Sequence, residues 1–153
     1  MSSFKNVKIY KTRSSSKIPS RAHPSDAGMD FFYCPPEDTP ITIPPNESAV
    51  LPTGVKVEVP SGYMLQVMNK SGIASKRSLI TGACVVDEGY TGEIFVNLHN
   101  VGKSMQTVDP GQKVAQGVFV KIMQPVLVEI EEDNIYGMST SRGCGALGST
   151  GDL

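Results

Sequence analysis

Apolar residues recur at every second position along most of the chain, which is the period of a half-buried β-strand. Val55, Val57 and Val59 alternate with Lys56 and Glu58, for example. Short sequences rich in glycine, proline and aspartate separate these stretches and favour turns. We therefore expect strands at residues 7–11, 29–34, 41–43, 48–59, 62–68, 79–86, 93–100, 113–122 and 125–130.

One stretch, SGIASKRSL at residues 71–79, favours a helix instead. Ser71 is of the type that caps a helix N-terminus, whereas Gly72 weakens the first turn. So short a helix depends on packing against the rest of the protein. The pattern as a whole predicts an all-β fold, a sandwich or a barrel, with one short helix and no second domain.

Composition and charge exclude several classes of function. The 153 residues suffice for one domain with a hydrophobic core, and 11 prolines and 15 glycines suit many short strands joined by tight turns. The net charge of -1 gives no basic field, so we expect no nucleic-acid partner. No apolar run approaches membrane-spanning length, so we expect no membrane partner.

The cysteines and the N-terminus bear on the cellular compartment. Cys34, Cys84 and Cys144 are odd in number and widely spaced, which fits a reducing compartment and gives no zinc pattern. Basic residues outnumber acidic ones before Asp26, as in some transit peptides, but residues 7–11 read as a strand of the folded domain. We therefore expect no signal peptide and a cytoplasmic protein, or a host-cell cytoplasmic or nuclear one if the source is viral.

The C-terminal sequence RGCGALGSTG, residues 142–151, contains four glycines and has little apolar surface. Such a segment is usually a mobile terminus, because glycine loses much backbone entropy when it is ordered. The same residues also suit a phosphate-binding arm. Glycine lets backbone N–H groups approach a polyanion, Ser149 and Thr150 add hydroxyl donors, and Arg142 adds a forked cation.

Polar residues interrupt the apolar strands at three positions. Asp30 opens an apolar run, Asp87 follows the sequence ACVV, and Gln116 lies inside KVAQGVFV. Each alone has an ordinary structural interpretation, such as a turn-capping aspartate or an edge-strand glutamine. The two histidines, His23 and His99, favour surface or structural roles, and no nucleophile-elbow serine or Walker-type phosphate loop is present.

Taken together, five segments resemble the five motifs of the trimeric dUTP pyrophosphatases, or dUTPases. They are AGMDFF (27–32), NKSGIAS (69–75), GACVVDEGYTGEI (82–94), GQKVAQGVF (111–119) and RGCGALGSTG (142–151). The resemblance implies a jelly-roll-like distorted β-barrel at residues 1–136, followed by a flexible C-terminal arm at residues 137–153. It also implies a homotrimer with active sites at subunit interfaces, Mg²⁺ as cofactor, and hydrolysis of dUTP to dUMP and pyrophosphate.

The resemblance assigns roles to the polar residues. Asp87 would hold and activate the water that attacks the α-phosphate, and one such carboxylate is what general-base chemistry requires. Tyr90 would pack against the deoxyribose and leave no room for a 2′-hydroxyl, and Asp30 would contact Mg²⁺ through water. The other substrate-binding residues that the resemblance implies are Lys70, Ser71, Gly72, Gly82, Val86, Gln116, Arg142, Leu147, Gly148, Ser149 and Thr150.

Departures from the family pattern bear on alternatives. Lys70 stands where the family often has arginine, and Leu147 replaces the phenylalanine that stacks over uracil. A related enzyme, dCTP deaminase, would need a glutamate at the position of Asn97 to transfer a proton during deamination. The amide of Asn97 cannot transfer that proton, which argues against this alternative. A binding module of the same fold without turnover is the other alternative, but the chain keeps Asp87 and Gln116.

Overall fold

The computed structural model of the chain describes residues 6–147 and Gly151. They belong to two compact units, residues 1–123 and 124–153. The first unit contains β1 (Ile9–Lys11), β2 (Met29–Phe32), β3 (Ile41–Ile43), β4 (Ser48–Pro52), β5 (Val55–Val57), β6 (Tyr63–Met68), α1 (Ser71–Arg77), β7 (Leu79–Thr81), β8 (Val85–Val86), β9 (Phe95–Asn100), β10 (Gln106–Val108) and β11 (Lys113–Lys121).

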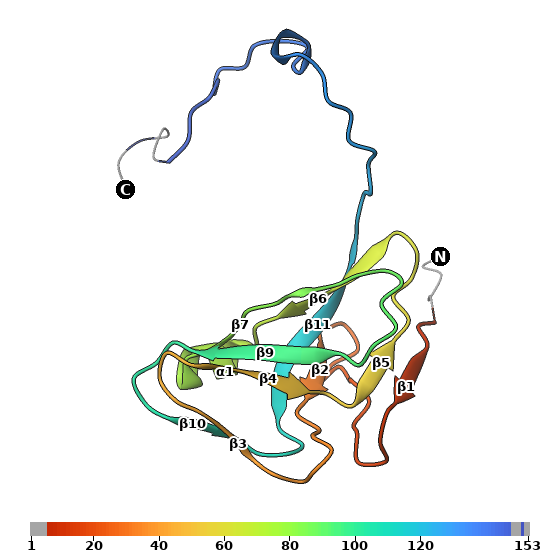
Figure 1. Cartoon of the computed structure of the whole chain (residues 1–153), viewed down its shortest axis with the longest axis vertical. Helices are drawn as coiled ribbons and strands as arrows, with labels where there is room; N and C mark the ends of the chain where they lie inside the picture. The colour runs from red at the N-terminus through yellow and green to blue at the C-terminus, as the bar shows by residue number, and fades with distance from the viewer. Residues whose placement is uncertain (1–5, 148–150, 152–153) are drawn as a thin grey trace. The chain divides into compact units, whose positions relative to one another are not determined.

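The strands of the first unit form antiparallel sheets (Figure 1). The largest has the order β2-β11-β6-β8, and a second has the order β4-β9-β7. The pairs β1-β5 and β3-β10 complete the unit. Along β9, Val96 and Leu98 are buried whereas Phe95 and His99 are exposed, so the alternation in the sequence corresponds to an inner and an outer face.

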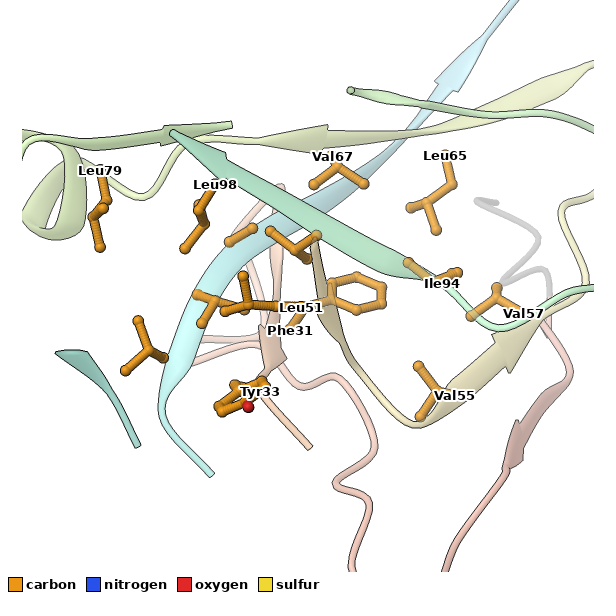
Figure 2. Packing of buried hydrophobic residues seen from close by; sticks show 14 of the residues in the cluster. Phe31, Tyr33, Leu51, Val55, Val57, Leu65, Val67, Leu79, Ile94 and Leu98 are labelled. Carbon is orange, nitrogen blue, oxygen red and sulfur yellow. The ribbon is translucent and has the colours of Figure 1, made fainter. Parts of the chain in front are cut away.

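The hydrophobic core fills the space between these sheets (Figure 2). Phe31 and Leu65 come from the larger sheet, Leu51 and Leu98 from the second, and each is at most 1% exposed. Full burial of one such side chain contributes roughly 1.5–3 kcal/mol. Burial of these side chains therefore fixes the positions of the strands, and the polar loops begin at the ends of these strands.

The all-β fold with one short α-helix is confirmed, with local differences. The strand expected at residues 48–59 is divided into β4 and β5, because Gly54 adopts a φ of 72° between them. The strand expected at 79–86 is likewise divided into β7 and β8. Strand β10 was not predicted, because its three residues contain a single aliphatic side chain.

The strand predicted at residues 125–130 is wrong for the single chain. The described part of the second unit contains one 3₁₀ turn, η1 (Glu132–Asn134), and no β-strand. Val126 and Leu127 are each 90% exposed. A strand needs a neighbour for its backbone hydrogen bonds, and none of the described residues forms a strand beside this segment.

Helix α1 begins one residue earlier than a Ser71 cap would imply. Lys70 occupies the N-cap position without a side-chain capping bond, so Ser71 is the first helical residue and the predicted cap is wrong. At the other end, Arg77 fixes the helix: its Nε donates to Gln106 Oε1 at 3.0 Å and its Nη2 to the Thr107 carbonyl at 2.5 Å. No α-helix within residues 6–147 is long and apolar enough to cross a membrane.

Ser78, which follows α1, adopts a left-handed conformation with a φ of 53°. Glycine is the residue that favours this position at a helix C-terminus. We expect Ser78→Gly to stabilise the protein by up to about 1 kcal/mol and to raise Tm by about 2–4 °C. Ser75→Gly, inside the helix, should have the opposite sign. Differential scanning calorimetry checks both, and a lower Tm for Ser78→Gly would contradict the prediction.

Candidate active site

One polar cleft lies beside the loop between β6 and α1, and we call it the lysine cleft. It has a volume of about 220 Å³ and is lined by Ala22, Asp26, Ala27, Gly28, Asp30, Lys70 and Gln116. Antiparallel pairing brings these segments together, because Gln116 on β11 faces Asp30 on β2 and Met68 on β6. The Gln116 amide donates to the Asn69 carbonyl at 2.9 Å, which fixes its orientation at the cleft.

Asp30 holds two lysines in this cleft. Lys70 donates to its Oδ1, and Lys113 donates to its Oδ2 at 2.7 Å, while Asp30 itself is 5% exposed. Burial alone would raise the pKa of Asp30, but the hydrogen bonds and charges of Lys113 and Lys70 outweigh burial and lower it. Asp30 is therefore a carboxylate at neutral pH, and it orders both ammonium groups.

The structure explains why residue 28, in the sequence AGMDFF, is a glycine. A Cβ at this position would lie 2.8 Å from Cδ of Gln116, closer than real Cβ contacts. The side chain of Gln116 therefore lies over the backbone of residue 28, and a larger residue there would displace it. Beyond the cleft, Ser71 and Gly72 start α1 and are exposed, with open space where a Cβ of Gly72 would be.

A second cleft, which we call the turn cleft, lies beside the turn that follows β8. It has a volume of about 330 Å³ and is lined by Val85, Val86, Asp87, Tyr90, Glu93, Ile94 and Phe95. The N–H of Tyr90 donates to the Asp87 carbonyl at 3.2 Å, and Gly89 between them has a φ of 86°. The turn therefore places the Asp87 carboxylate and the Tyr90 ring at one cleft, both exposed.

The Tyr90 ring folds back over its own turn. Its hydroxyl donates to the Glu93 carbonyl at 2.9 Å. A Cβ at Gly92 would lie 2.6 Å from Cζ of the ring, so the ring covers the backbone of this glycine. These contacts give the ring a defined orientation although Tyr90 is 46% exposed.

The two clefts are separate in one chain and share none of their lining residues. On β6, Met68 faces Gln116 while Leu65 faces Val86 on the opposite side. Three residues along a strand and two strand spacings across the sheet place the backbones of Gln116 and Val86 about 14 Å apart. The structure thus groups Asp30, Lys70 and Gln116, and it groups Val86, Asp87 and Tyr90, but it does not join the groups.

Gly82 lies outside both clefts, after β7. Its N–H donates to the Asn97 carbonyl at 2.9 Å. A Cβ there would meet the side chain of Asn97 and would lie 2.5 Å from Nε2 of His99. Asn97 and His99 bond each other at 2.8 Å, so glycine leaves room for this polar pair.

The remaining predicted residues belong to the second unit. Arg142 donates from Nε to the Gly145 carbonyl at 3.2 Å, and Leu147 is fully exposed with a φ of 48°. The predicted phosphate contacts Gly148, Ser149 and Thr150 lie outside the described residues.

Sequence reasoning did not find Lys113 or Asn69 as parts of the site. Lys113 lies in the motif GQKVAQGVF, but its pairing with Asp30 depends on β2 lying beside β11, which no local pattern of the sequence indicates. Asn69 accepts from the N–H of Thr81 through Oδ1 at 2.7 Å and from Gln116 through its carbonyl. Nothing in the spacing of the sequence indicates that double role.

Comparison with known proteins decides the family. A family model described as dUTPase matches residues 14–151. This chain belongs to the dUTPase family.

Two relatives are named deoxyuridine 5′-triphosphate nucleotidohydrolase. The one from Chlamydia trachomatis serovar D is 40% identical over 144 residues, 93% of this chain and 96% of the relative. The one from Caulobacter vibrioides strain NA1000 is 37% identical over 136 residues, 88% of this chain and 85% of the relative.

Solved dUTPase structures have the same fold. The dUTPase of Staphylococcus bacteriophage 80alpha with dUpNHpp matches with a TM-score of 0.86 and 25% identity, over 96% of this chain and 99% of the phage chain. A mutant dUTPase from phage phi11 of S. aureus, described with a structural Mg(II) ion, matches with a TM-score of 0.76 and 26% identity, over 84% of this chain and 98% of the phage chain. These matches confirm the expected jelly-roll-like β fold of the family.

Proposed function

We propose that this chain carries out the dUTP hydrolysis of its family, forming dUMP and pyrophosphate, with Asp87 holding the attacking water. The observation that carries this assignment is the turn after β8, which presents Asp87 and Tyr90 at one cleft. A carboxylate beside the α-phosphate accepts a proton from water, while positioning supplies much of the rate. The reaction limits uracil in DNA and supplies dUMP for dTTP synthesis.

Sugar recognition is the proposed role of Tyr90. The flat ring, held by its hydroxyl bond to Glu93, would cover the deoxyribose and exclude a 2′-hydroxyl. The backbone of the same turn, with Val86, would face the uracil, whereas Gly82, which lies outside both clefts, is assigned to the substrate by the resemblance alone. Rigid backbone is suited to rejecting the methyl group of thymine, because an apolar pocket discriminates one methylene by only about 1–3 kcal/mol.

Phosphate binding is the proposed role of the lysine cleft. Lys70 supplies a cation whose position Asp30 fixes, and Gln116 supplies an amide. Ser71 and Gly72 add exposed hydroxyl and backbone donors beside them. Arg142, Leu147, Gly148, Ser149 and Thr150 of the C-terminal segment would close over the nucleotide, as the resemblance of the fifth motif implies.

The family resemblance implies a homotrimer with composite sites, and the separation of the two clefts supports this proposal. We propose that the turn cleft of one copy faces the lysine cleft of a neighbouring copy, so that both act on one nucleotide. The exposed apolar residues Val126, Leu127 and Val128 support assembly, because a surface of this kind is usually covered by a partner. Sedimentation equilibrium should give a trimer, and a monomer that hydrolyses dUTP at full rate would contradict the proposal.

Magnesium fits this site only through water. Both oxygens of Asp30 bind lysines, and the described residues include no cluster of three His, Cys, Asp or Glu side chains. Mg²⁺ commonly keeps several waters and takes its other ligands from substrate phosphates, whose charge it neutralises. Asp30 is the residue that would reach its water shell, and the protein need not supply an inner ligand.

Removing Mg²⁺ should therefore affect turnover and not the fold. We expect EDTA to abolish most dUTP hydrolysis while the Tm of the substrate-free protein stays unchanged, since no metal-binding cluster lies among the described residues. Pyrophosphate release and calorimetry measure the two quantities. A Tm lowered by EDTA and restored by Mg²⁺ would show a structural ion instead.

Gly28→Ala should weaken substrate binding through Gln116. The added Cβ displaces the Gln116 side chain, so the amide no longer meets the phosphate. Loss of one such hydrogen bond predicts a KM for dUTP raised up to about tenfold, with a smaller change in kcat. Gly137→Ala is the matched control, because a Cβ there meets open space. An unchanged KM for Gly28→Ala would remove Gln116 from phosphate binding.

A nucleotide panel tests the function itself. Pyrophosphate and ammonia are measured with dUTP, UTP, dTTP and dCTP in the presence of Mg²⁺. We expect pyrophosphate from dUTP well above the other three nucleotides. Ammonia release from dCTP would favour the deaminase, and absence of any turnover would favour a binding module.

A further inference from the structure

We infer that Arg13 is a positioning residue for Tyr90, acting through Glu93, and that it thereby sets the preference of the site for deoxyribose over ribose. The inference rests on the proposed role of Tyr90 in sugar recognition. Arg13 lies in the loop after β1, outside all five segments that resemble family motifs.

Arg13 binds Glu93 through three hydrogen bonds from the two ends of its guanidinium fork. Nη1 donates to Oε1 at 3.0 Å, and Nη2 donates to Oε1 at 2.8 Å and to Oε2 at 3.0 Å. The two side chains are only 18% and 16% exposed, so solvent screens this ion pair less than a surface pair. A planar fork fixes the direction as well as the distance of its partner.

Glu93 is held from a second side by the turn between β4 and β5. Its Oε1 accepts from the N–H of Gly54 at 2.7 Å. The N–H of Thr12, next to Arg13, donates to the Gly54 carbonyl at 2.8 Å, and Arg13 Nη1 donates to Thr12 Oγ1 at 2.8 Å. The network therefore joins three segments of the chain and fixes the end of the turn at Glu93.

The orientation of the Tyr90 ring depends on the position of the Glu93 backbone at the end of the turn. Its hydroxyl donates to the Glu93 carbonyl, and its ring lies over Gly92. Because the ring is 46% exposed, packing restrains it weakly, and these contacts decide its orientation. A displaced Glu93 backbone therefore displaces the ring.

Sugar discrimination is sensitive to such a displacement. A ring that excludes a 2′-hydroxyl does so only while it stays in contact with the sugar, and a loose pocket tolerates an added hydroxyl. A shift of about 1 Å at a site can cost as much as 10²-fold in rate. Arg13 thus acts on specificity without touching the nucleotide.

The experiment compares Arg13→Met, which removes the fork, with Arg13→Lys, which keeps the charge. The ratio of kcat/KM for dUTP to that for UTP is measured for each. We expect the ratio to fall by about 10- to 100-fold in Arg13→Met, with Arg13→Lys intermediate. Lys103→Met is the matched control, since Lys103 is exposed in the loop between β9 and β10 and lines no cleft with Tyr90, and its ratio should stay unchanged.

A double-mutant cycle and an NMR measurement separate positioning from mere stability. In a Glu93→Gln background, Arg13→Met should lower the ratio much less than in the wild type, because the pair is already broken. The Tyr90 ring signals of the substrate-free protein should shift or broaden in Arg13→Met and stay as in the wild type in Lys103→Met.

Two results would overturn the inference: Arg13→Met lowers Tm but leaves the dUTP to UTP ratio unchanged, or the Tyr90 ring signals do not respond. If the wild type hydrolyses no dUTP, the proposed function fails. The ring signals then still decide whether Arg13 positions Tyr90, so the two failures are distinguishable.

Discussion

Asp87→Asn should lower kcat for dUTP by about 10²- to 10⁴-fold, the usual contribution of a general base. The amide has nearly the same shape and leaves the Tyr90 N–H bond to the residue 87 carbonyl intact, so the turn should keep its geometry. It cannot accept a proton from water. We therefore expect the affinity for the analogue dUpNHpp to change only a few-fold, because binding does not need the base.

The matched control for Asp87→Asn is Glu88→Gln in the same turn. Glu88 is exposed and accepts from the N–H of Gly62 at 3.1 Å, so this change removes a neighbouring carboxylate without touching the proposed water. Stopped-flow pyrophosphate release gives kcat, and calorimetric titration with dUpNHpp gives Kd. Near wild-type kcat in Asp87→Asn would remove Asp87 from the mechanism.

Two inactive variants should restore activity when they assemble together. One carries Asp87→Asn and loses the turn cleft, and the other carries Lys70→Met with Gln116→Leu and loses the phosphate contacts of the lysine cleft. If each site takes one cleft from each of two copies, a mixed trimer contains sites with both clefts intact. Equal random mixing predicts about one quarter of wild-type activity, since each cleft is intact in half of the copies.

The measurement is dUTP turnover after co-refolding of the two variants, compared with the same variants refolded separately and then combined. Asp30 keeps its bond to Lys113 in the second variant, so the fold of the lysine cleft should survive. Activity that does not exceed the sum of the separate variants would show that each site lies within one chain.

The sequence predicted the fold where the pattern is local. The alternation at Val96 and Leu98 corresponds to β9 with its inner face buried. The break at Gly54 depends on a positive φ, which the apolar pattern does not reveal. The segment at residues 125–130 has the pattern of a strand, but a strand needs a neighbour, and within residues 6–147 none pairs with it.

In the candidate site, too, contacts within one turn could be predicted from the sequence, whereas contacts between distant segments could not. Asp87 and Tyr90 lie within one turn, so their proximity could be predicted from sequence spacing. The pairing of Asp30 with Lys113 depends on β2 lying beside β11, and that of Arg13 with Glu93 depends on tertiary contacts between distant loops. Such pairs are set by the fold, and no spacing in one sequence encodes them.

The most direct measurement is a crystal structure of the assembled protein with dUpNHpp and Mg²⁺. The account predicts a water within hydrogen-bond distance of an Asp87 oxygen, in line with the α-phosphorus, while Lys70 and Gln116 of a neighbouring copy contact the phosphates of the same nucleotide. A nucleotide bound with Asp87 out of reach of any such water, or with both clefts supplied by one chain, would contradict it.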